Sequence, residues 1–281
     1  MTSNIIKFVW GNKIHEIHNP DPNETILNYV RLKLKRTGTK EGCAEGGCGS
    51  CTVVLGELKK NNIIYKAINA CIAFTPSLEG KLLILVEDLV LKGELHPVQK
   101  AMVDFHGSQC GFCTPGFVMS LFAMYKNYSS YNYNVIKDSI QGNLCRCTGY
   151  RPIVDAAKSL IKKRKSDHFS RDKKNIVTLL KKIKQRSIAI NVNNKKYFAP
   201  KTINELKKII KQNPNSKLLS GGTDVSLIVT KERKDLNSLI YMNSIDELNY
   251  IKKDKNYIEV GASTPLISFE SFIKKYFPDF T

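Results

Sequence analysis

The spacing of the cysteines restricts what this chain can fold into more than any other feature. Cys43, Cys48 and Cys51 are separated by four and then two residues, and Cys71 follows after nineteen more. Four thiolates at this spacing are typical ligands of a [2Fe–2S] cluster. Zinc sites more often combine two short Cys-x-x-Cys segments, so the spacing favours iron and sulfide and leaves zinc as the alternative.

Glycines surround the first three of these cysteines. Residues 40–52 contain Gly42, Gly46, Gly47 and Gly49. Glycine lacks a Cβ and adopts positive φ angles at little cost, so this backbone can wrap closely around a cluster. In such a loop, backbone N–H groups point at the sulfurs and offset the charge of the thiolates. The composition of the loop therefore supports the cluster interpretation.

A second set of cysteines lies further along the chain. Cys110 and Cys113 flank two residues, and Cys145 and Cys147 flank one. These four thiols make a second complete tetrathiolate site. All eight cysteines of the chain are then used as metal ligands, and none is left for a disulfide.

The N-terminal third has the pattern of a small mixed sheet. Gly11 and Asn12 form a turn between two alternating segments, which predicts a β-hairpin. The expected elements are strands at residues 4–10, 13–18, 52–55, 63–65 and 82–86 and a helix at residues 25–34. A mixed sheet with one helix and a cysteine loop resembles the β-grasp fold of plant-type ferredoxins.

From about residue 91 the pattern is helical. Pro97 and Pro115 stand where the first residue of a helix is expected. The predicted helices are residues 97–105, 116–125, 135–141 and 152–162. The second cysteine set falls at loops beside helix ends, where the N-terminal dipole favours thiolates. We therefore expect a small helical domain that carries the second cluster.

The net charge of the chain is high and unevenly distributed. Of a formal charge of +19, residues 161–186 supply eleven Lys or Arg against two Asp. Such a charge raises the question of a nucleic-acid partner. Only Phe169 interrupts the basic run as an aromatic residue, so base stacking is not supported. The segment is predicted to be a solvated basic linker, and no nucleic-acid partner is expected.

After the linker, short strands alternate with a helix. Strands are expected at residues 217–220, 239–242 and 258–261, and an amphipathic helix capped near Thr202 at residues 203–211. A Gly-Gly turn at residues 220–224 follows the first strand and can present backbone N–H groups to a pyrophosphate. A plain turn is the more common meaning of such a sequence, and it is not a G-x-G-x-x-G dinucleotide fingerprint.

Taken together, these segments resemble the molybdenum hydroxylases, a family that includes xanthine dehydrogenases, aldehyde oxidases and carbon monoxide dehydrogenases. The segments similar to their two-cluster iron–sulfur domain are GTKEGCAEGGCGSCTVVL, HPVQKAM, SQCGFCTPGFVMS and GNLCRCTGYRPIVDA. The segments similar to their FAD-binding domain are LLSGGTDVSLIV and VGASTPLISFE. Having both parts in one chain resembles the xanthine dehydrogenase small subunit.

The resemblance implies an α+β chain of several parts. These are a β-grasp ferredoxin-like domain at residues 1–90, a four-helix [2Fe–2S]-binding domain at 91–165, a basic linker at 166–190 and the N-terminal part of an α+β FAD-binding domain at 191–281. The family's flavin domain continues beyond the part matched here, with a second glycine-rich flavin loop and a C-terminal lobe. The chain is therefore expected to be a C-terminally truncated form of the subunit.

The resemblance also implies the site residues. One cluster would be held by Cys43, Cys48, Cys51 and Cys71, and the other, nearer the molybdenum, by Cys110, Cys113, Cys145 and Cys147. Gln109 matches the position that hydrogen-bonds the molybdopterin of the partner subunit, with a surface glutamine as an equal alternative. The FAD pyrophosphate would be lined, mainly by backbone groups, by Leu218, Leu219, Ser220, Gly221, Gly222, Thr223, Asp224 and Val225. No side chain of this chain is expected to act as an acid, base or nucleophile.

The function implied is that of an oxidoreductase subunit of xanthine dehydrogenase type, active only with a partner. Electrons would pass from a molybdopterin site in a molybdenum-binding large subunit through two [2Fe–2S] clusters to FAD and then to NAD. A free-standing two-cluster carrier with a non-functional flavin domain is the alternative, and a zinc-stabilised nucleic-acid-binding protein is a third.

The sequence also bears on the compartment. No apolar run approaches the roughly 18 to 20 residues that span a bilayer. The first ten residues lack the basic and apolar regions of a secretory signal. Thiols committed to metal ligation fit a reducing compartment, so we expect a cytoplasmic protein without a membrane partner.

Overall fold

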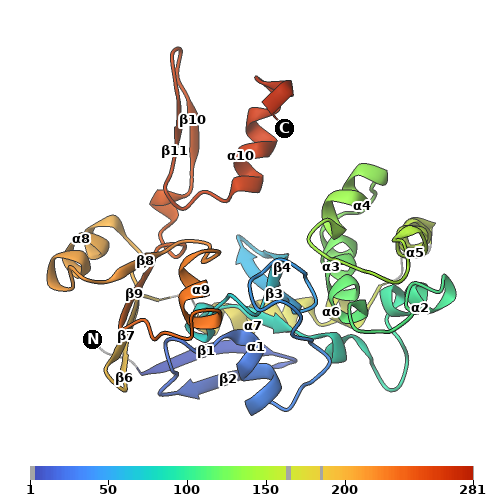
Figure 1. The fold of residues 1–281 in the computed structure, drawn as a ribbon, viewed down its shortest axis with the longest axis horizontal. Coiled ribbons are helices and arrows are strands. Elements are labelled where there is room, and N and C mark those ends of the chain that lie inside the picture. Colours follow the sequence, from blue (N-terminus) through green and yellow to red (C-terminus); the bar gives the residue numbers. More distant parts are fainter. Residues whose placement is uncertain (1–3, 163–165, 184–185, 281) are drawn as a thin grey trace.

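The structure is a computed structural model that describes residues 4–162, 166–183 and 186–280 (Figure 1). Its N-terminal part is a five-stranded sheet in the order β2-β1-β5-β3-β4, in which β1 and β5 are parallel and the other pairs antiparallel. The strands are β1 (Ile5–Trp10), β2 (Lys13–His18), β3 (Thr52–Lys59), β4 (Asn62–Asn69) and β5 (Leu82–Ile84). The predicted hairpin and the three further strands are confirmed.

The first sheet is buried on both faces. Successive residues of β3 alternate between two hydrophobic cores, Val54 facing one and Val53 and Leu55 the other. This alternation follows from the two-residue period of a strand, and it explains the continuous apolar run in the sequence. The predicted helix at residues 25–34 is present as α1 (Ile26–Asn28), capped by Thr25, followed by one π-helical turn at Tyr29–Lys33.

Four helices form the next part, as predicted. They are α2 (Pro97–Asp104), α3 (Thr114–Asn127), α4 (Tyr133–Ile140) and α5 (Arg151–Lys162). Every residue of α3 from Gly116 to Tyr125 is buried, because this helix lies between the other helices and the strands β3 and β4. A helix that is apolar all round is the expected sequence of such a central position.

The predicted solvated linker differs from the structure. Its described residues include two helices, α6 (His168–Arg171) and α7 (Lys173–Ile183). Ile176, Leu180 and Ile183 recur at helical spacing, are buried, and place α7 against strands of the first sheet. The lysines of α7 lie on its solvent side. The segment is therefore an amphipathic helix, although its high content of lysine had indicated a linker.

We expect Leu180→Ala to lower the free energy of unfolding by about 2 to 5 kcal/mol, the cost of truncating a buried leucine. Thr178→Ala, on the exposed side of the same helix, should change it by less than about 0.5 kcal/mol. Urea unfolding followed by circular dichroism measures both. Equal stability of the two variants would restore the linker interpretation.

The C-terminal part contains two further sheets. A four-stranded sheet has the order β6-β7-β9-β8, and a two-stranded hairpin joins β10 and β11. The elements are β6 (Ile188–Val192), β7 (Lys195–Ala199), α8 (Ile203–Gln212), β8 (Lys217–Leu219), α9 (Val225–Thr230), β9 (Ser238–Tyr241), β10 (Ile251–Lys253), β11 (Ile258–Val260) and α10 (Leu266–Ile273). The predicted helix and three strands are confirmed, whereas β6, β7, β10, α9 and α10 were not predicted.

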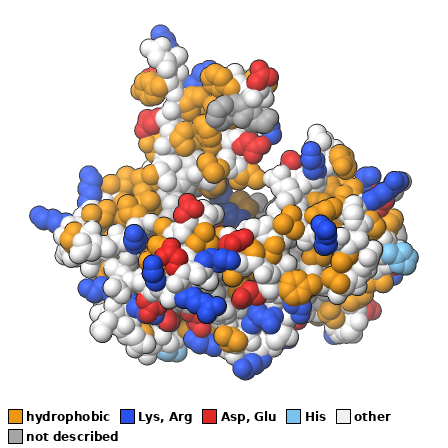
Figure 2. Space-filling model, in the orientation of Figure 1, with side chains coloured by type: hydrophobic (Ala, Val, Ile, Leu, Met, Phe, Trp, Pro, Cys, Tyr) orange, Lys and Arg blue, Asp and Glu red, His pale blue; other side chains and the backbone are white. Residues whose placement is uncertain are grey.

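The hairpin β10–β11 and helix α10 project from the rest of the molecule (Figure 1). Apolar side chains gather on this projecting part, as Figure 2 shows. Tyr257, Leu266, Ile267 and Phe277 are all exposed there.

The four-stranded sheet shares a hydrophobic core with the first sheet. Tyr197 and Leu239 of the C-terminal part pack in the same cluster as Phe8 and Leu83. Asn23 adds a two-way link, because its side chain donates to the Leu236 carbonyl at 3.0 Å and accepts from the Leu236 N–H at 2.8 Å. The domain limits expected from the sequence stay a prediction, and the buried core extends across them.

Candidate functional site

The first cysteine loop runs between α1 and β3 without regular secondary structure. Cys51 and Cys71 are buried, whereas Cys43 and Cys48 are partly exposed. The loop is closed tightly over its sulfurs: a Cβ on Gly42 would stand 2.8 Å from the Cys48 Sγ. Glycine is therefore required at this position by the close approach of the backbone to a sulfur, which fits a cluster-binding loop.

Backbone donors surround the sulfurs of this loop. Partial burial opposes ionisation of Cys43, but N–H groups of Glu45, Gly47 and Cys48 donate to its sulfur and lower the pKa of the thiol overall. The Cys48 N–H lies 3.4 Å from the Cys43 Sγ. The loop is therefore arranged to stabilise thiolates, the form in which cysteine binds iron.

The structure brings these thiols together in pairs. Cys51 is hydrogen-bonded to Cys71, which lowers the pKa of Cys51 and raises that of Cys71 well above its usual range. No group of three or more His, Cys, Asp or Glu side chains in the described part of the chain forms a single-ion site. The assignment of the eight cysteines to two sets of four therefore stays a prediction.

The second cysteine set lies at the surface of the helical part. Cys110 and Cys147 are exposed and in contact, and Cys113 precedes α3 and contacts Cys145. Burial and the contact with Cys145 raise the pKa of the Cys113 thiol to about 12. The Cys145 sulfur is partly buried, but it lies 3.1 Å from the Thr148 hydroxyl, and the N–H groups of the same turn help lower its pKa.

A direct junction joins the two cysteine loops. The Leu144 N–H donates to the Cys48 carbonyl at 2.9 Å. Cys48 belongs to the first predicted ligand set, and Leu144 directly precedes Cys145 of the second, so this hydrogen bond connects the two sets. Buried Asn143 holds the junction: its amide donates to the Gly49 carbonyl at 3.0 Å and to Thr52 Oγ1 at 3.2 Å. Its Oδ1 accepts from Ser120 Oγ at 2.6 Å. Sequence reasoning did not identify Asn143, because its role depends on partners 23 to 94 residues away.

The predicted flavin loop follows β8. Gly221 and Gly222 have φ angles of +45° and +88°, which favour glycine. The backbone N–H groups of Gly221, Gly222 and Thr223 have no acceptor among the described residues. A run of free N–H groups on a glycine turn is what a pyrophosphate requires, so this loop fits the predicted cofactor. Leu218 is half-exposed and Leu219 is buried, which agrees with contacts made mainly by the backbone.

The flavin loop lies against the residue that follows Cys71. A Cβ on Gly222 would stand 3.4 Å from the carbonyl oxygen of Ile72, the residue after Cys71. Buried Ser226, in the first turn of α9, donates to that same carbonyl at 2.7 Å. This hydrogen bond joins two predicted sites, although Ser226 and Ile72 are 154 residues apart in the chain. Gln109 lies exposed beside Cys110, and its role stays a prediction.

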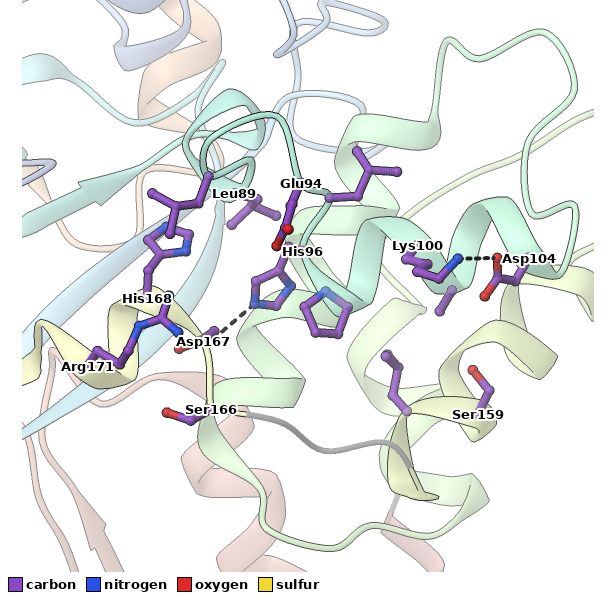
Figure 3. A pocket seen from close by; sticks show the side chains of 15 residues that line it. Leu89, Glu94, His96, Lys100, Asp104, Ser159, Ser166, Asp167, His168 and Arg171 are labelled. Carbon is purple, nitrogen blue, oxygen red and sulfur yellow. Dashed lines mark hydrogen bonds and ion pairs between the residues drawn. The ribbon is translucent and has the colours of Figure 1, made fainter.

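A cavity of about 610 Å³ lies elsewhere, between α2, α5 and α6 (Figure 3). Its floor contains His96, whose Nε2 lies 3.0 Å from the Asp167 carboxylate and whose Nδ1 caps α2 by accepting from the Val98 N–H. His96 is therefore the N-cap residue of α2. None of the predicted site residues lines this cavity.

Three family models match consecutive parts of the chain. Residues 10–75 match a 2Fe-2S iron-sulfur cluster binding domain, residues 85–158 a [2Fe-2S] binding domain and residues 190–281 an FAD binding domain in molybdopterin dehydrogenase. These matches define a chain with two [2Fe–2S] domains and an FAD-binding domain.

Curated relatives with sequence similarity to nearly the whole chain are xanthine dehydrogenases. The chain is 33% identical over 297 residues to xanthine dehydrogenase of Emericella nidulans, in a match that covers 89% of this chain and 22% of that protein. Against xanthine dehydrogenase/oxidase of Rattus norvegicus the identity is 32%, covering 96% of this chain and 23% of the relative. Together with the three domains, these similarities fit a chain of molybdenum hydroxylase type. It spans less than a quarter of the length of these relatives.

A solved structure of a related enzyme has a similar fold. The aldehyde oxidoreductase from Desulfovibrio desulfuricans is 28% identical and superimposes with a TM-score of 0.50, over 66% of this chain and 18% of that one. The α+β fold expected from the sequence is thereby confirmed. No helix in the described part of the chain is long and apolar enough to cross a bilayer.

Proposed function

We propose that this chain is the electron-transfer component of a xanthine dehydrogenase-like molybdenum hydroxylase. Cys110, Cys113, Cys145 and Cys147 hold the cluster that receives electrons, Cys43, Cys48, Cys51 and Cys71 hold the second cluster in the series, and residues 218–225 hold FAD. The bound clusters and the flavin supply the redox chemistry, and electrons leave to NAD. The protein remains cytoplasmic and works without nucleic acid or membrane.

One observation carries this proposal: the two contacts that arrange the three sites in series. The Leu144–Cys48 hydrogen bond joins the second cysteine set to the first. The Ser226–Ile72 hydrogen bond joins the helix after the flavin loop to the residue that follows Cys71. A relay needs short, fixed separations between its cofactors, and hydrogen bonds between their binding loops fix them.

The exposed end of this series is suited to a protein partner. Cys110 and Cys147 lie at the surface, and large apolar side chains within seven residues of them in the sequence are exposed, namely Val103, Phe105, Phe112, Leu144 and Tyr150. Aromatic and aliphatic side chains gathered at one surface are typical of an interface core. We infer that this face docks on a molybdenum-binding large subunit, with Gln109 at the contact.

The test is the content of FAD, iron and sulfide in anaerobically purified protein, alone and mixed with a molybdenum-binding subunit. We expect iron and sulfide in the amount of two [2Fe–2S] clusters per chain, with FAD, and co-elution with the large subunit. Two clusters without flavin would indicate a free-standing two-cluster carrier. Zinc in place of iron would reject the proposal.

A further inference from the structure

Lys231, which follows α9 in the flavin part, reaches the first cysteine loop. Its ammonium donates to the Cys43 carbonyl at 3.1 Å and pairs with the Glu45 carboxylate at 3.1 Å. Neither partner belongs to the flavin part, since Cys43 lies 188 residues earlier in the chain. A positive charge from one cofactor domain is therefore held beside a predicted iron ligand of another.

Helix α9 is held at both ends, at its start by Ile72, the residue after Cys71, and at its end by this loop. At its start, buried Ser226 donates to the Ile72 carbonyl at 2.7 Å, and its N–H bonds the Gly222 carbonyl at 3.0 Å. At its end, the Lys231 N–H bonds the Leu227 carbonyl at 2.8 Å, which continues the helical backbone to the lysine. The backbone that carries Lys231 is thus held in place, and the ammonium is placed by its own contacts to Cys43 and Glu45.

We propose that Lys231 is a positioning residue that raises the midpoint potential of the first cluster. The inference rests on the proposed assignment of Cys43 as a cluster ligand. Accepting one electron makes a tetrathiolate [2Fe–2S] cluster more negative by one charge, as one ferric ion becomes ferrous. A nearby cation stabilises the added charge, and the hydrogen bond to the Cys43 carbonyl holds the ammonium beside this ligand.

Glu45 opposes this effect, and the opposition gives the proposal its sharpest test. The Glu45 carboxylate forms an ion pair with the Lys231 ammonium, so the two charges shift the potential of the cluster in opposite directions. Lys231→Met should shift the midpoint potential of the first cluster to a more negative value. Glu45→Gln should shift it to a more positive value. The double variant should return close to the unmodified protein, because both charges are gone.

The measurement is a potentiometric titration with mediator dyes, in which reduced clusters are counted by electron paramagnetic resonance. The second cluster of the same molecule is an internal reference and should not move. Lys274→Met is the matched control, since Lys274 pairs with Glu270 at 2.8 Å and the pair is as exposed as Lys231 and Glu45. It should leave both potentials unchanged. Because both charges are half-exposed, the shifts should also shrink at high salt.

The outcomes separate this inference from the proposed function. The inference about Lys231 is supported if the two single variants shift the potential of the first cluster in opposite directions and leave that of the second cluster unchanged. Two assembled clusters whose potentials are the same in all variants would overturn it and leave the electron-transfer proposal standing. A protein without iron would overturn both. If Lys231→Met assembles poorly, Lys231→Gln replaces it, because the glutamine amide can donate to the Cys43 carbonyl without carrying the positive charge.

Discussion

Gly49→Ala is expected to disrupt both cysteine loops at once. The φ angle of Gly49 is +69°, and an added Cβ would stand 2.3 Å from the Gly142 carbonyl oxygen and 2.9 Å from the Asn143 Cα. Backbone atoms cannot move aside as a flexible side chain can, so the two loops must separate. We expect the free energy of unfolding to fall by about 3 kcal/mol or more, with loss of iron from both sites.

Two further variants isolate the cause. Gly11→Ala has a similar φ of +58° and no atom within 4 Å of the new Cβ, so it measures backbone strain alone and should cost about 1 kcal/mol. Gly116→Ala lies in α3, where alanine is intrinsically preferred, but its Cβ would stand 2.2 Å from the Gly49 carbonyl oxygen. It should be destabilising despite that preference. If Gly49→Ala behaves like Gly11→Ala in urea unfolding and iron content, the junction has no structural role.

Asp167→Asn is expected to cost about 3 to 5 kcal/mol, the penalty for removing one partner of a buried ion pair. The carboxylate accepts from Lys126 Nζ at 2.7 Å, and the side chains of Asp167 and Lys126 are both buried. The carboxylate also lies 3.0 Å from His96 Nε2 (Figure 3). The variant leaves the ammonium in the interior without its counter-charge. Thermal and urea unfolding measure the loss.

The control is Asp155→Asn, whose carboxylate faces Arg151 and Lys158 at the surface and should contribute less than about 1 kcal/mol. Burial alone would raise the pKa of Asp167, but the hydrogen bonds from His96, Lys126 and Ser170 outweigh it and hold the pKa well below its usual range. A depressed pKa gives stability that is present above the ordinary carboxyl value of about 3.9 and is lost as the pH falls below it. The difference between wild type and Asp167→Asn should therefore be full at pH 7 and shrink below about pH 4; a difference that grows in acid would contradict the assignment.

Local patterns predicted much of the fold. The hairpin around Gly11, the four helices after residue 91 and the strand before the Gly-Gly turn all lie where the sequence indicates, because each depends on nearby residues. Helix α7 was missed because its lysines dominated the composition, although Leu180 and Ile183 kept a helical period. The strands β6 and β7 were missed because they follow charged residues and are stabilised by pairing with each other and by β9.

The residues of the candidate site also fall into those that the sequence identifies and those that only the fold identifies. The cysteines and the glycine turn are recognisable from spacing alone, since metal ligation and close backbone approach demand particular residue types. Asn143, Ser226 and Lys231 carry no such signal. Each acts through a contact with a residue far away in the chain, so only the assembled fold identifies them.

The core shared by the first sheet and the four-stranded sheet limits how this molecule can be divided. Phe8 and Leu83 pack in the same cluster as Tyr197 and Leu239, so the iron–sulfur part and the flavin part each complete the other's interior. Expressed alone, either part would expose that apolar face to water and tend to aggregate. If the chain were divided at this point, the two products would have to associate through this face to keep it buried.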